Sequence, residues 1–309
     1  MPGVKGPRGI LRELGLAPAR RRSQNFLKDK EAARRMALLA RDEALAAGQP
    51  AVPGSAGEGR AAHPLALEVG PGLGALTRPL LDAGLRVCAV ELDRGLCAEL
   101  MKWPEALSGA LDPVCADVLK VDAARDLPRG IRCVCGNLPY GISTPFLFWF
   151  LESFGGSLPG VFMVQKEVAD RLAAPPGGKE YGRLSVALGS WFSVSVAFAL
   201  GPGAFHPRPR VDSAVAVLRP LKRRPSVTPG LLGRMTGICF HSRRKTLFNN
   251  LAAAFTKDKA RNALESLGVD GRARPEELPP EDYQRLAAAF AGEPGMGGSH
   301  AAGGEEDGV

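Results

Sequence analysis

The feature that most constrains the fold of this chain is a repeated alternation of strand-like and helical segments that begins at residue 65. Five short apolar runs have the length and composition of buried strands: residues 65–69, 86–91, 113–117, 131–135 and 161–164. Helical patterns lie between them. Strands that alternate with helices favour a parallel, doubly wound sheet. The sequence therefore predicts an α/β fold, which two further strands at 195–200 and 213–218 complete.

The composition changes along the chain and suggests domain limits. We expect the α/β domain at residues 23–220 and a small α-helical domain at 221–292, because strand signals stop after residue 220. Residues 1–22 are basic and rich in Gly and Pro, residues 48–64 are a Gly-, Ala- and Pro-rich insertion, and residues 293–309 are an acidic, Gly-rich tail. All three are expected to be flexible.

The positive charge is concentrated in one part of the chain. The formal net charge is +8, yet residues 205–261 alone hold 13 Lys and Arg against two acids. A segregated basic segment favours a polyanionic partner such as nucleic acid. Within it, Arg243, Arg244 and Lys245 open a predicted helix at 243–255, where positive charge opposes the helix dipole. A phosphate partner explains this placement, and a merely solvated face is the alternative.

The environment of the protein can also be inferred from sequence. The basic amino end is not followed by the apolar run of a signal peptide, and no apolar stretch is long enough to span a membrane. Four of the six cysteines lie in strand-like runs, which favours reduced core thiols over a metal site. We expect a cytoplasmic protein, a monomer, with no membrane partner and no metal.

The first predicted strand ends in a glycine-rich turn. Gly70-Pro71-Gly72-Leu73-Gly74 fits a dinucleotide-type fingerprint, in which Gly70 and Gly72 let the backbone approach a ligand. Glu91 lies at the end of the second strand, where a carboxylate can accept both ribose hydroxyls of an adenosyl group. Asp117 ends the third strand and can accept from an adenine amine. A plain tight turn, a solvated acid and a helix N-cap are the respective alternatives.

The fourth strand ends in Gly136-Asn137-Leu138-Pro139-Tyr140. The side-chain oxygen of Asn137 and the backbone carbonyl of Leu138 are two acceptors for the hydrogens of an exocyclic adenine amine. Pro139 stiffens the loop, and Tyr140 can stack on an unpaired base. Since orientation can supply about 7–11 kcal/mol, no strong base is needed for methyl transfer to this nitrogen. A turn with an incidental aromatic residue is the alternative.

With these residues assembled, the chain resembles the RNA adenine N6-dimethyltransferase family over residues 23–291. Within that family it is most similar to the bacterial branch that acts on the small ribosomal subunit. The matching segments are Gln24–Leu27, Glu68–Thr77, Glu91–Asp93, Gly136–Tyr140, Ile142–Pro145, Gln165–Val168, Tyr181–Ser185, Phe205–Ser213 and Arg243–Thr246. Gly141 departs from the family, which usually has Asn there, and we expect it to loosen the loop.

The resemblance implies a Rossmann-like, S-adenosylmethionine-dependent methyltransferase domain. It implies contacts with S-adenosylmethionine, the methyl donor, at Asn25, Leu27, Gly70, Glu91, Asp117 and Asn137. The implied substrate is 16S rRNA within the 30S ribosomal subunit, where two adjacent adenines near the 3′ end each receive two methyl groups during ribosome biogenesis. Arg208, Arg210 and the Arg243–Lys245 cluster are the expected RNA-binding residues.

Three other functions compete with this hypothesis. A 23S rRNA adenine N6-methyltransferase of the macrolide-resistance type shares the fold and the acceptor loop. An NAD-dependent oxidoreductase could use the glycine turn, but it would not explain Asn137–Tyr140 or the basic segment. A non-catalytic RNA-binding ribosome-assembly factor would not require an intact donor site.

Overall fold

The computed structural model describes residues 7–13, 15, 24–47 and 63–296. The predicted flexible segments therefore lie largely outside the described residues. One described part of them differs from expectation, because residues 7–13 form helix α1 (Pro7–Glu13). Leu11 of this helix is buried against Phe26 and Leu96. A helix of only seven residues is too short to show a clear period in the sequence, which explains why the sequence does not predict it.

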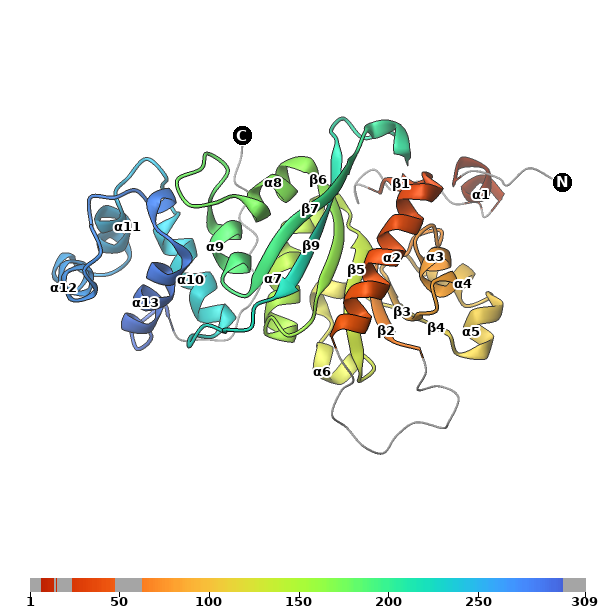
Figure 1. The fold of residues 1–309 in the computed structure, drawn as a ribbon, viewed down its shortest axis with the longest axis horizontal. Helices are drawn as coiled ribbons and strands as arrows, with labels where there is room; N and C mark the ends of the chain where they lie inside the picture. The colour runs from red at the N-terminus through yellow and green to blue at the C-terminus, as the bar shows by residue number, and fades with distance from the viewer. Residues whose placement is uncertain (1–6, 14, 16–23, 48–62, 297–309) are drawn as a thin grey trace. The chain divides into compact units, whose positions relative to one another are not determined.

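A seven-stranded sheet forms the centre of the first compact unit, in the order β4-β3-β2-β5-β6-β9-β7 (Figure 1). Its strands are β2 (Leu65–Val69), β3 (Arg86–Glu91), β4 (Leu111–Cys115), β5 (Ile131–Asn137), β6 (Gly160–Gln165), β7 (Phe192–Leu200) and β9 (Ser213–Pro220). The strands from β4 to β6 are parallel to their neighbours, and β9 runs antiparallel to both β6 and β7. The predicted doubly wound α/β fold is confirmed.

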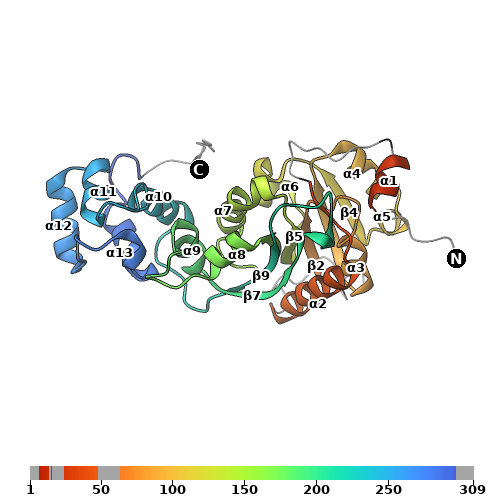
Figure 2. The ribbon, with the colours of Figure 1, turned by 90° about the horizontal axis from the view of Figure 1, so that it is seen from above.

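Helices cover both faces of this sheet. They are α2 (Lys30–Ala46), α3 (Thr77–Asp82), α4 (Arg94–Leu100), α5 (Pro104–Ser108), α6 (Ala123–Asp126), α7 (Ser143–Phe154) and α8 (Lys166–Ala173). Figure 2 shows α2 and α3 on one face, with α4, α6 and α7 on the other. None of the helices in the described ranges is long and apolar enough to cross a membrane.

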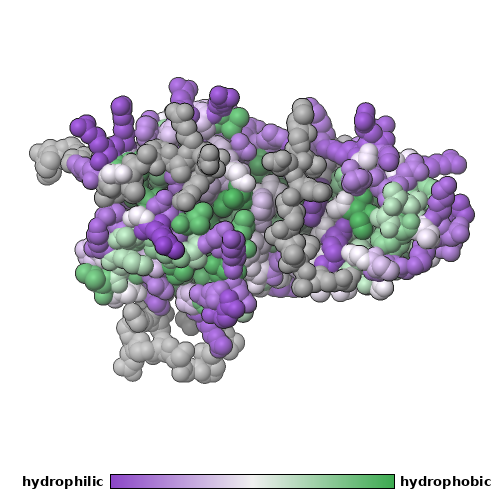
Figure 3. All heavy atoms as spheres, turned by 180° about the vertical axis from the view of Figure 1, so that it is seen from behind, coloured by the Kyte–Doolittle hydropathy of each residue, from purple (hydrophilic) through white to green (hydrophobic). Residues whose placement is uncertain are grey.

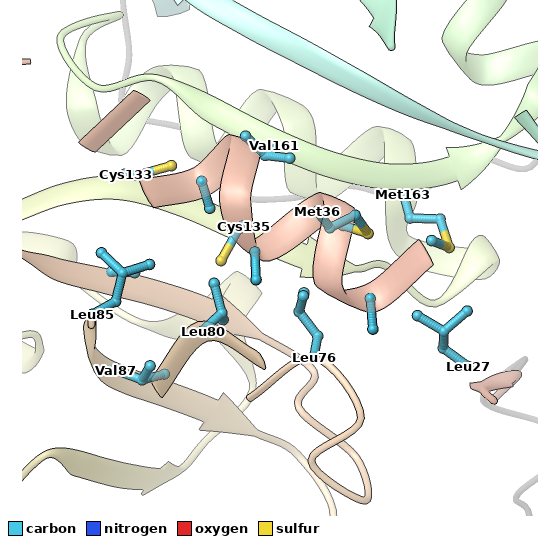
Figure 4. Packing of buried hydrophobic residues seen from close by; sticks show 14 of the residues in the cluster. Leu27, Met36, Leu76, Leu80, Leu85, Val87, Cys133, Cys135, Val161 and Met163 are labelled. Atoms are coloured by element: carbon cyan, nitrogen blue, oxygen red, sulfur yellow. The ribbon is translucent and has the colours of Figure 1, made fainter. Parts of the chain in front are cut away.

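The side chains of β6 alternate between two cores, as the two-residue period of a strand requires. Val161 and Met163 face α2, where Met36 packs between the strands and α3 (Figure 4). Phe162 points the other way and meets the rings of Phe146 and Phe150 of α7, with ring centroids 5.3 and 5.2 Å apart.

Cys133 and Cys135 of β5 are part of the same core as Met36, with exposed fractions of 0% and 1%. Both thiols lie on one face of the strand, as expected, and their burial raises their pKa above the ordinary value of a thiol. They behave as small apolar core residues.

Two very short strands form a separate ribbon that the sequence did not predict. β1 (Phe26–Leu27) pairs antiparallel with β8 (Phe205–His206). The backbone N–H of Lys28 extends the pairing by donating to the carbonyl of Ala204 at 2.9 Å. This ribbon ties the start of the α/β unit to the link between its last two strands.

The second compact unit is helical, and its described residues are 174–191 and 222–296. Its described helices are α9 (Arg183–Gly189), α10 (Pro229–Cys239), α11 (Leu247–Ala254), α12 (Lys257–Leu267) and α13 (Pro280–Ala289). The expected limit between the domains was residue 220, with residues 174–191 in the α/β domain.

The difference has a physical reason in Tyr181. This side chain is buried, its hydroxyl donates to the carbonyl of Leu278 at 2.9 Å, and its ring packs edge-on against Phe240. Phe240 in turn stacks on Tyr283. Residues 174–191 therefore share the core of the helical unit, although they lie between two strands of the sheet in sequence.

Candidate active site

A cavity opens at the carboxyl edge of the parallel strands, within the first unit. In doubly wound sheets ligands bind at this edge, at the point where the strand order reverses. Here the order reverses at β2, whose neighbours are β3 on one side and β5 on the other. The cavity has a volume of about 270 Å³, and it is lined by all ten residues predicted for catalysis or cofactor binding: Asn25, Leu27, Gly70, Gly72, Glu91, Asp117, Asn137, Leu138, Pro139 and Tyr140.

The glycine turn after β2 depends on backbone conformations that favour glycine. Gly70, Gly72 and Gly74 have φ values of 68°, 56° and 78°. A Cβ on Gly74 would lie 2.2 Å from Cη2 of Trp103, so the ring occupies the space that a side chain would need. The guanidinium of Arg78 lies over the same ring at 4.3 Å from its centroid. Trp103 thus packs against the back of the turn and holds its shape.

Glu91 connects the end of β3 to the glycine turn. Its Oε2 accepts from the backbone N–H of Gly72 at 3.0 Å, and its Oε1 accepts from that of Asp93 at 2.8 Å. Burial raises the pKa of this carboxyl, and the two backbone donors lower it. Each carboxylate oxygen has further lone pairs. The side chain is therefore held rigidly while it keeps the capacity to accept from a ligand.

Glu68 of β2 is a second buried acid in the cavity wall, with an exposed fraction of 1%. Burial raises its pKa to about 8, and the charge of Glu91 adds to the shift. Among the described residues, its Oε2 has no hydrogen-bond partner, while the nearby Thr77 hydroxyl lowers the pKa of the carboxyl. A buried carboxyl with one unsatisfied oxygen suits a cavity built for a polar ligand.

Asp117 caps a helix, which is the alternative role that the sequence left open for it. Its Oδ1 accepts from the backbone N–H of Leu119 at 3.1 Å, which caps the short 3₁₀ helix Val118–Lys120. The residue nevertheless lines the cavity, together with the apolar side chains of Leu92, Val118 and Leu119. β4 ends at Cys115, two residues before the predicted end of the third strand, so Asp117 lies in the loop beyond it.

Asn137 is oriented by the amino-terminal segment. Its Nδ2 donates to the backbone carbonyl of Asn25 at 3.0 Å, so the nitrogen of the amide is committed and the oxygen is the end offered as an acceptor. The neighbouring Leu138 is fixed by its own backbone N–H, which donates to the carbonyl of Met163 at 3.0 Å. The acceptor pair predicted from the sequence is thus anchored at two places, by the Asn137 side chain to Asn25 and by the Leu138 backbone to Met163 of β6.

Pro139 and Tyr140 complete the loop. The carbonyl of Pro139 accepts from the hydroxyl of Ser143 at 3.2 Å, and a one-turn 3₁₀ helix spans Tyr140–Ile142. The Tyr140 hydroxyl forms a 2.6 Å hydrogen bond with Ser213, and its ring stays half-buried at the cavity. Gly141 lies exposed within the 3₁₀ turn.

The sequence did not assign roles to several residues that the cavity brings together. Phe26 lines it between the two predicted contacts Asn25 and Leu27, and its ring lies 3.1 Å from where a Cβ on Gly72 would be. Gln24 and Leu92 are also in the wall. These residues adjoin positions of the predicted site in the sequence, but the apolar side chains of Phe26 and Leu92 carry no chemistry that would mark them.

The five predicted RNA-binding residues do not line the cavity. Arg208 and Arg210 are exposed in the link before β9. Arg243, Arg244 and Lys245 are exposed in the helical unit, where hydrophilic side chains project from the face shown in Figure 3. The prediction that this cluster opens a helix is wrong: α11 begins at Leu247, capped by Thr246, and the cluster lies in the turn before it. Arg243 donates to the carbonyl of Lys179 at 2.9 Å.

Taken together, the cavity offers acceptors among apolar walls beside a loop that presents an amide oxygen and an aromatic ring. Its described lining residues include no nucleophile paired with a base. This arrangement suits a ligand with hydroxyl, amine and cationic groups, and it suits transfer of a group to a planar amine, where alignment of the reactants carries the rate.

Comparison with known proteins agrees with this chemistry. Curated relatives called ribosomal RNA small subunit methyltransferase A include one from Leptothrix cholodnii, 42% identical over 72% of this chain and 80% of that protein. Another, from Legionella pneumophila strain Corby, is 43% identical over 74% of this chain and 89% of that protein. The relative from Pseudomonas aeruginosa is 42% identical, with coverages of 74% and 85%.

Solved structures show the same fold. The dimethyladenosine transferase from Plasmodium falciparum has a TM-score of 0.64 and 23% identity, covering 86% of this chain and 97% of that one. The 23S rRNA methyltransferase ErmE has a TM-score of 0.57 and 27% identity, with coverages of 86% and 99%. Residues 20–291 match the family described as ribosomal RNA adenine dimethylase. The chain therefore belongs to the ribosomal RNA adenine dimethylase family.

Proposed function

We propose that this protein uses S-adenosylmethionine to dimethylate N6 of two adjacent adenines near the 3′ end of 16S rRNA, within the 30S subunit. The observation that carries the proposal is the Asn137 amide, whose nitrogen is committed to Asn25 and whose oxygen is presented at the cavity. Family membership and the small-subunit names of its relatives support the choice of ribosomal RNA.

The residues around the cavity fit S-adenosylmethionine. Glu91 and Asp117 provide acceptors for ribose hydroxyls and an adenine amine, and the backbone of Gly70 and Gly72 leaves room for close approach. The Oε2 of Glu68, which has no partner among the described residues, can accept a hydrogen bond from a polar group of the ligand. When bound, this donor supplies a methyl group on a positively charged sulfur.

The acceptor side follows from the loop Asn137–Tyr140. The Asn137 side-chain oxygen and the Leu138 carbonyl accept the two hydrogens of the adenine amine, which directs the nitrogen lone pair away from the ring plane. Tyr140 stacks on the extruded base. The proton released after transfer needs no protein base, because a methylated and positively charged nitrogen is acidic enough to lose it to water.

The helical unit contributes RNA affinity in this proposal. Arg243, Arg244 and Lys245 bind phosphates, and Arg208 and Arg210 of the α/β unit bind the backbone near the acceptor adenines. The α/β unit at 24–173 and 192–221 carries the chemistry, and the protein acts as a monomer. This assignment replaces the oxidoreductase alternative, since the family is one of adenine dimethylases.

The test is transfer of labelled methyl groups to 30S subunits that lack the modification, with 50S subunits as a parallel substrate. We expect label in 16S rRNA only, at two adjacent adenines that block primer extension. Label in 23S rRNA would favour the activity of the ErmE-like alternative. Binding to 30S subunits without label in either RNA would instead favour an assembly factor that has lost turnover.

A further inference from the structure

The residue that holds the far end of Tyr140 is Ser213, which lies 73 residues further along the chain. The hydroxyls of the two side chains are 2.6 Å apart. Ser213 is completely buried, and although it ends the Phe205–Ser213 segment that resembles the family, the sequence did not assign it a role of its own. We propose that Ser213 is a positioning residue, which sets the tilt of the Tyr140 ring against the acceptor base. The proposal rests on the methyl transfer proposed above.

Ser213 is fixed far more firmly than its partner. It is the first residue of β9, where it pairs with Gln165 of β6 and with Leu200 of β7. Both neighbours belong to the central sheet, so the position of the Ser213 hydroxyl is set by two strand ladders. A side chain in such a place has one environment and little freedom.

The backbone around Tyr140 is held by far fewer contacts than the strand that carries Ser213. It begins a one-turn 3₁₀ helix, is half-buried, and is followed by the exposed Gly141. A tyrosine held only at its Cα can rotate about χ1 and χ2. Once its hydroxyl is held as well, both ends of the side chain are fixed and the plane of the ring is defined. Because Ser213 is fixed by the sheet, its hydrogen bond also fixes the orientation of the Tyr140 ring that would stack on the base.

The chemistry of the pair agrees with this role. Burial raises the pKa of the Tyr140 phenol above its usual value, and the hydrogen bond with Ser213 lowers it. The phenol thus stays protonated at neutral pH, and two neutral hydroxyls can bond whichever of them is the donor. Because the serine hydroxyl does not ionise either, the hydrogen bond persists across the physiological pH range.

A double-mutant cycle separates a positioning role from a general structural one. We expect Ser213→Ala to lower kcat about 10-fold, because misorientation at a reacting centre is costly, while Kd for S-adenosylmethionine changes less than about 2-fold. Tyr140→Phe, which keeps the ring and removes the hydroxyl, is expected to lose a similar factor. Ser213→Ala added to Tyr140→Phe is then expected to cost nothing more. An equal further loss in that background would overturn the proposal.

The matched control is Ser190→Ala. Ser190, which directly follows α9, is also buried, but its hydroxyl donates to the carbonyl of Val186 in that helix, at 2.8 Å. We expect this variant to keep kcat, because it removes a buried hydroxyl without touching the acceptor loop. A loss of the same size in Ser190→Ala would attribute the effect of Ser213→Ala to lost stability.

A second measurement needs no RNA. The sequence holds three tyrosines, so protein labelled with 3-fluorotyrosine gives three ¹⁹F signals, and Tyr140→Phe assigns one of them. Ser213→Ala is expected to shift and broaden that signal alone and to raise the pKa of the Tyr140 phenol. An unchanged signal would refute the positioning role. If wild-type protein transfers no methyl group, the proposed function fails, while the ¹⁹F signal still decides whether Ser213 orients Tyr140.

Discussion

The side-chain amide of Asn137 has two different ends, and the structure gives a partner to the nitrogen. The nitrogen donates to the carbonyl of Asn25, and in the proposed function the oxygen accepts from the acceptor amine. Asn137→Asp is therefore more informative than removal of the side chain. It keeps the shape but replaces the donor with an anion that faces a carbonyl oxygen, so the carboxylate must turn away or take up a proton.

We expect Asn137→Asp to lower kcat by at least about 100-fold, because an acceptor displaced by about 1 Å no longer aligns the amine. Binding of RNA should stay within a few-fold of wild type. The measurement is single-turnover methyl transfer beside a filter-binding assay. Retention of wild-type turnover in this variant would contradict the role of the amide.

Glu68 gives a prediction about stability and pH. Its carboxyl pKa is about 8 in the folded protein, against an ordinary value of 4.5, because it is buried. Between these two pH values the folded state keeps a proton that the unfolded state has lost, so this group makes stability fall as pH rises. Below pH 4.5 it has no such effect, and above pH 8 its contribution is constant.

Glu68→Gln removes this titration. We expect the difference in unfolding free energy between the variant and wild type to move in favour of the variant by on the order of 4 kcal/mol from pH 4.5 to pH 8, since one pKa unit corresponds to about 1.4 kcal/mol and the titration is half complete at each end of this range. Urea unfolding at several pH values measures it. A difference that stays constant with pH would show that Glu68 is ionised in the folded protein.

At the scale of the element, the glycine turn after β2 depends on Trp103 in the loop before α5. Gly74→Ala forces a left-handed backbone onto alanine and places its Cβ 2.2 Å from the ring. Gly130→Ala is a matched control, because Gly130 has a similar φ of 85° but no atom within 4 Å of the added Cβ.

We expect the control to cost about 1–3 kcal/mol from backbone strain alone, and Gly74→Ala to cost more. Because Trp103 must move, the turn should also lose affinity for S-adenosylmethionine by about 10-fold or more, measured by calorimetry. Equal costs in the two variants would mean that Trp103 does not brace the turn.

The helices and strands also show which parts of the fold can be predicted from the sequence. The strands of the sheet and the edge that carries the cavity could be predicted, because alternation and apolar runs are local signals. β1 and β8 could not, since two residues each are too short to show a period. Ser213 reads as an ordinary strand residue, and only the fold brings its hydroxyl to Tyr140. Tyr181 likewise gives no local sign that its partner is Leu278.

At the scale of the whole molecule, the uneven charge predicts how RNA binding responds to salt. Arg243, Arg244 and Lys245 are exposed in a turn of the helical unit. Replacing all three by Gln should weaken binding to 30S subunits and reduce the slope of log K against log salt by about 2–3, since each phosphate contact contributes about 0.7–0.9. Methyl transfer at saturating RNA should change little.

The control removes the same charge elsewhere, from three exposed cations of the α/β unit: Lys102, Arg125 and Arg129. It should leave the slope nearly unchanged. If both triple variants lower the slope alike, the affinity follows total charge and the Arg243–Lys245 cluster is an ordinary solvated surface.

The ribbon of β1 and β8 has a consequence for how the protein is made. β1 carries Phe26 and Leu27 into the cavity wall, directly after Asn25, yet its pairing partner, Phe205–His206, is synthesised only after most of the sheet. Domains begin to fold during synthesis from the amino end. A growing chain that has reached residue 200 already contains the glycine turn and the acceptor loop, but it lacks the strand that pairs with Phe26 and Leu27 and the hydroxyl that holds Tyr140. The proposed site therefore has all of its supports only after residue 213 has been synthesised, although every predicted cavity residue is present earlier.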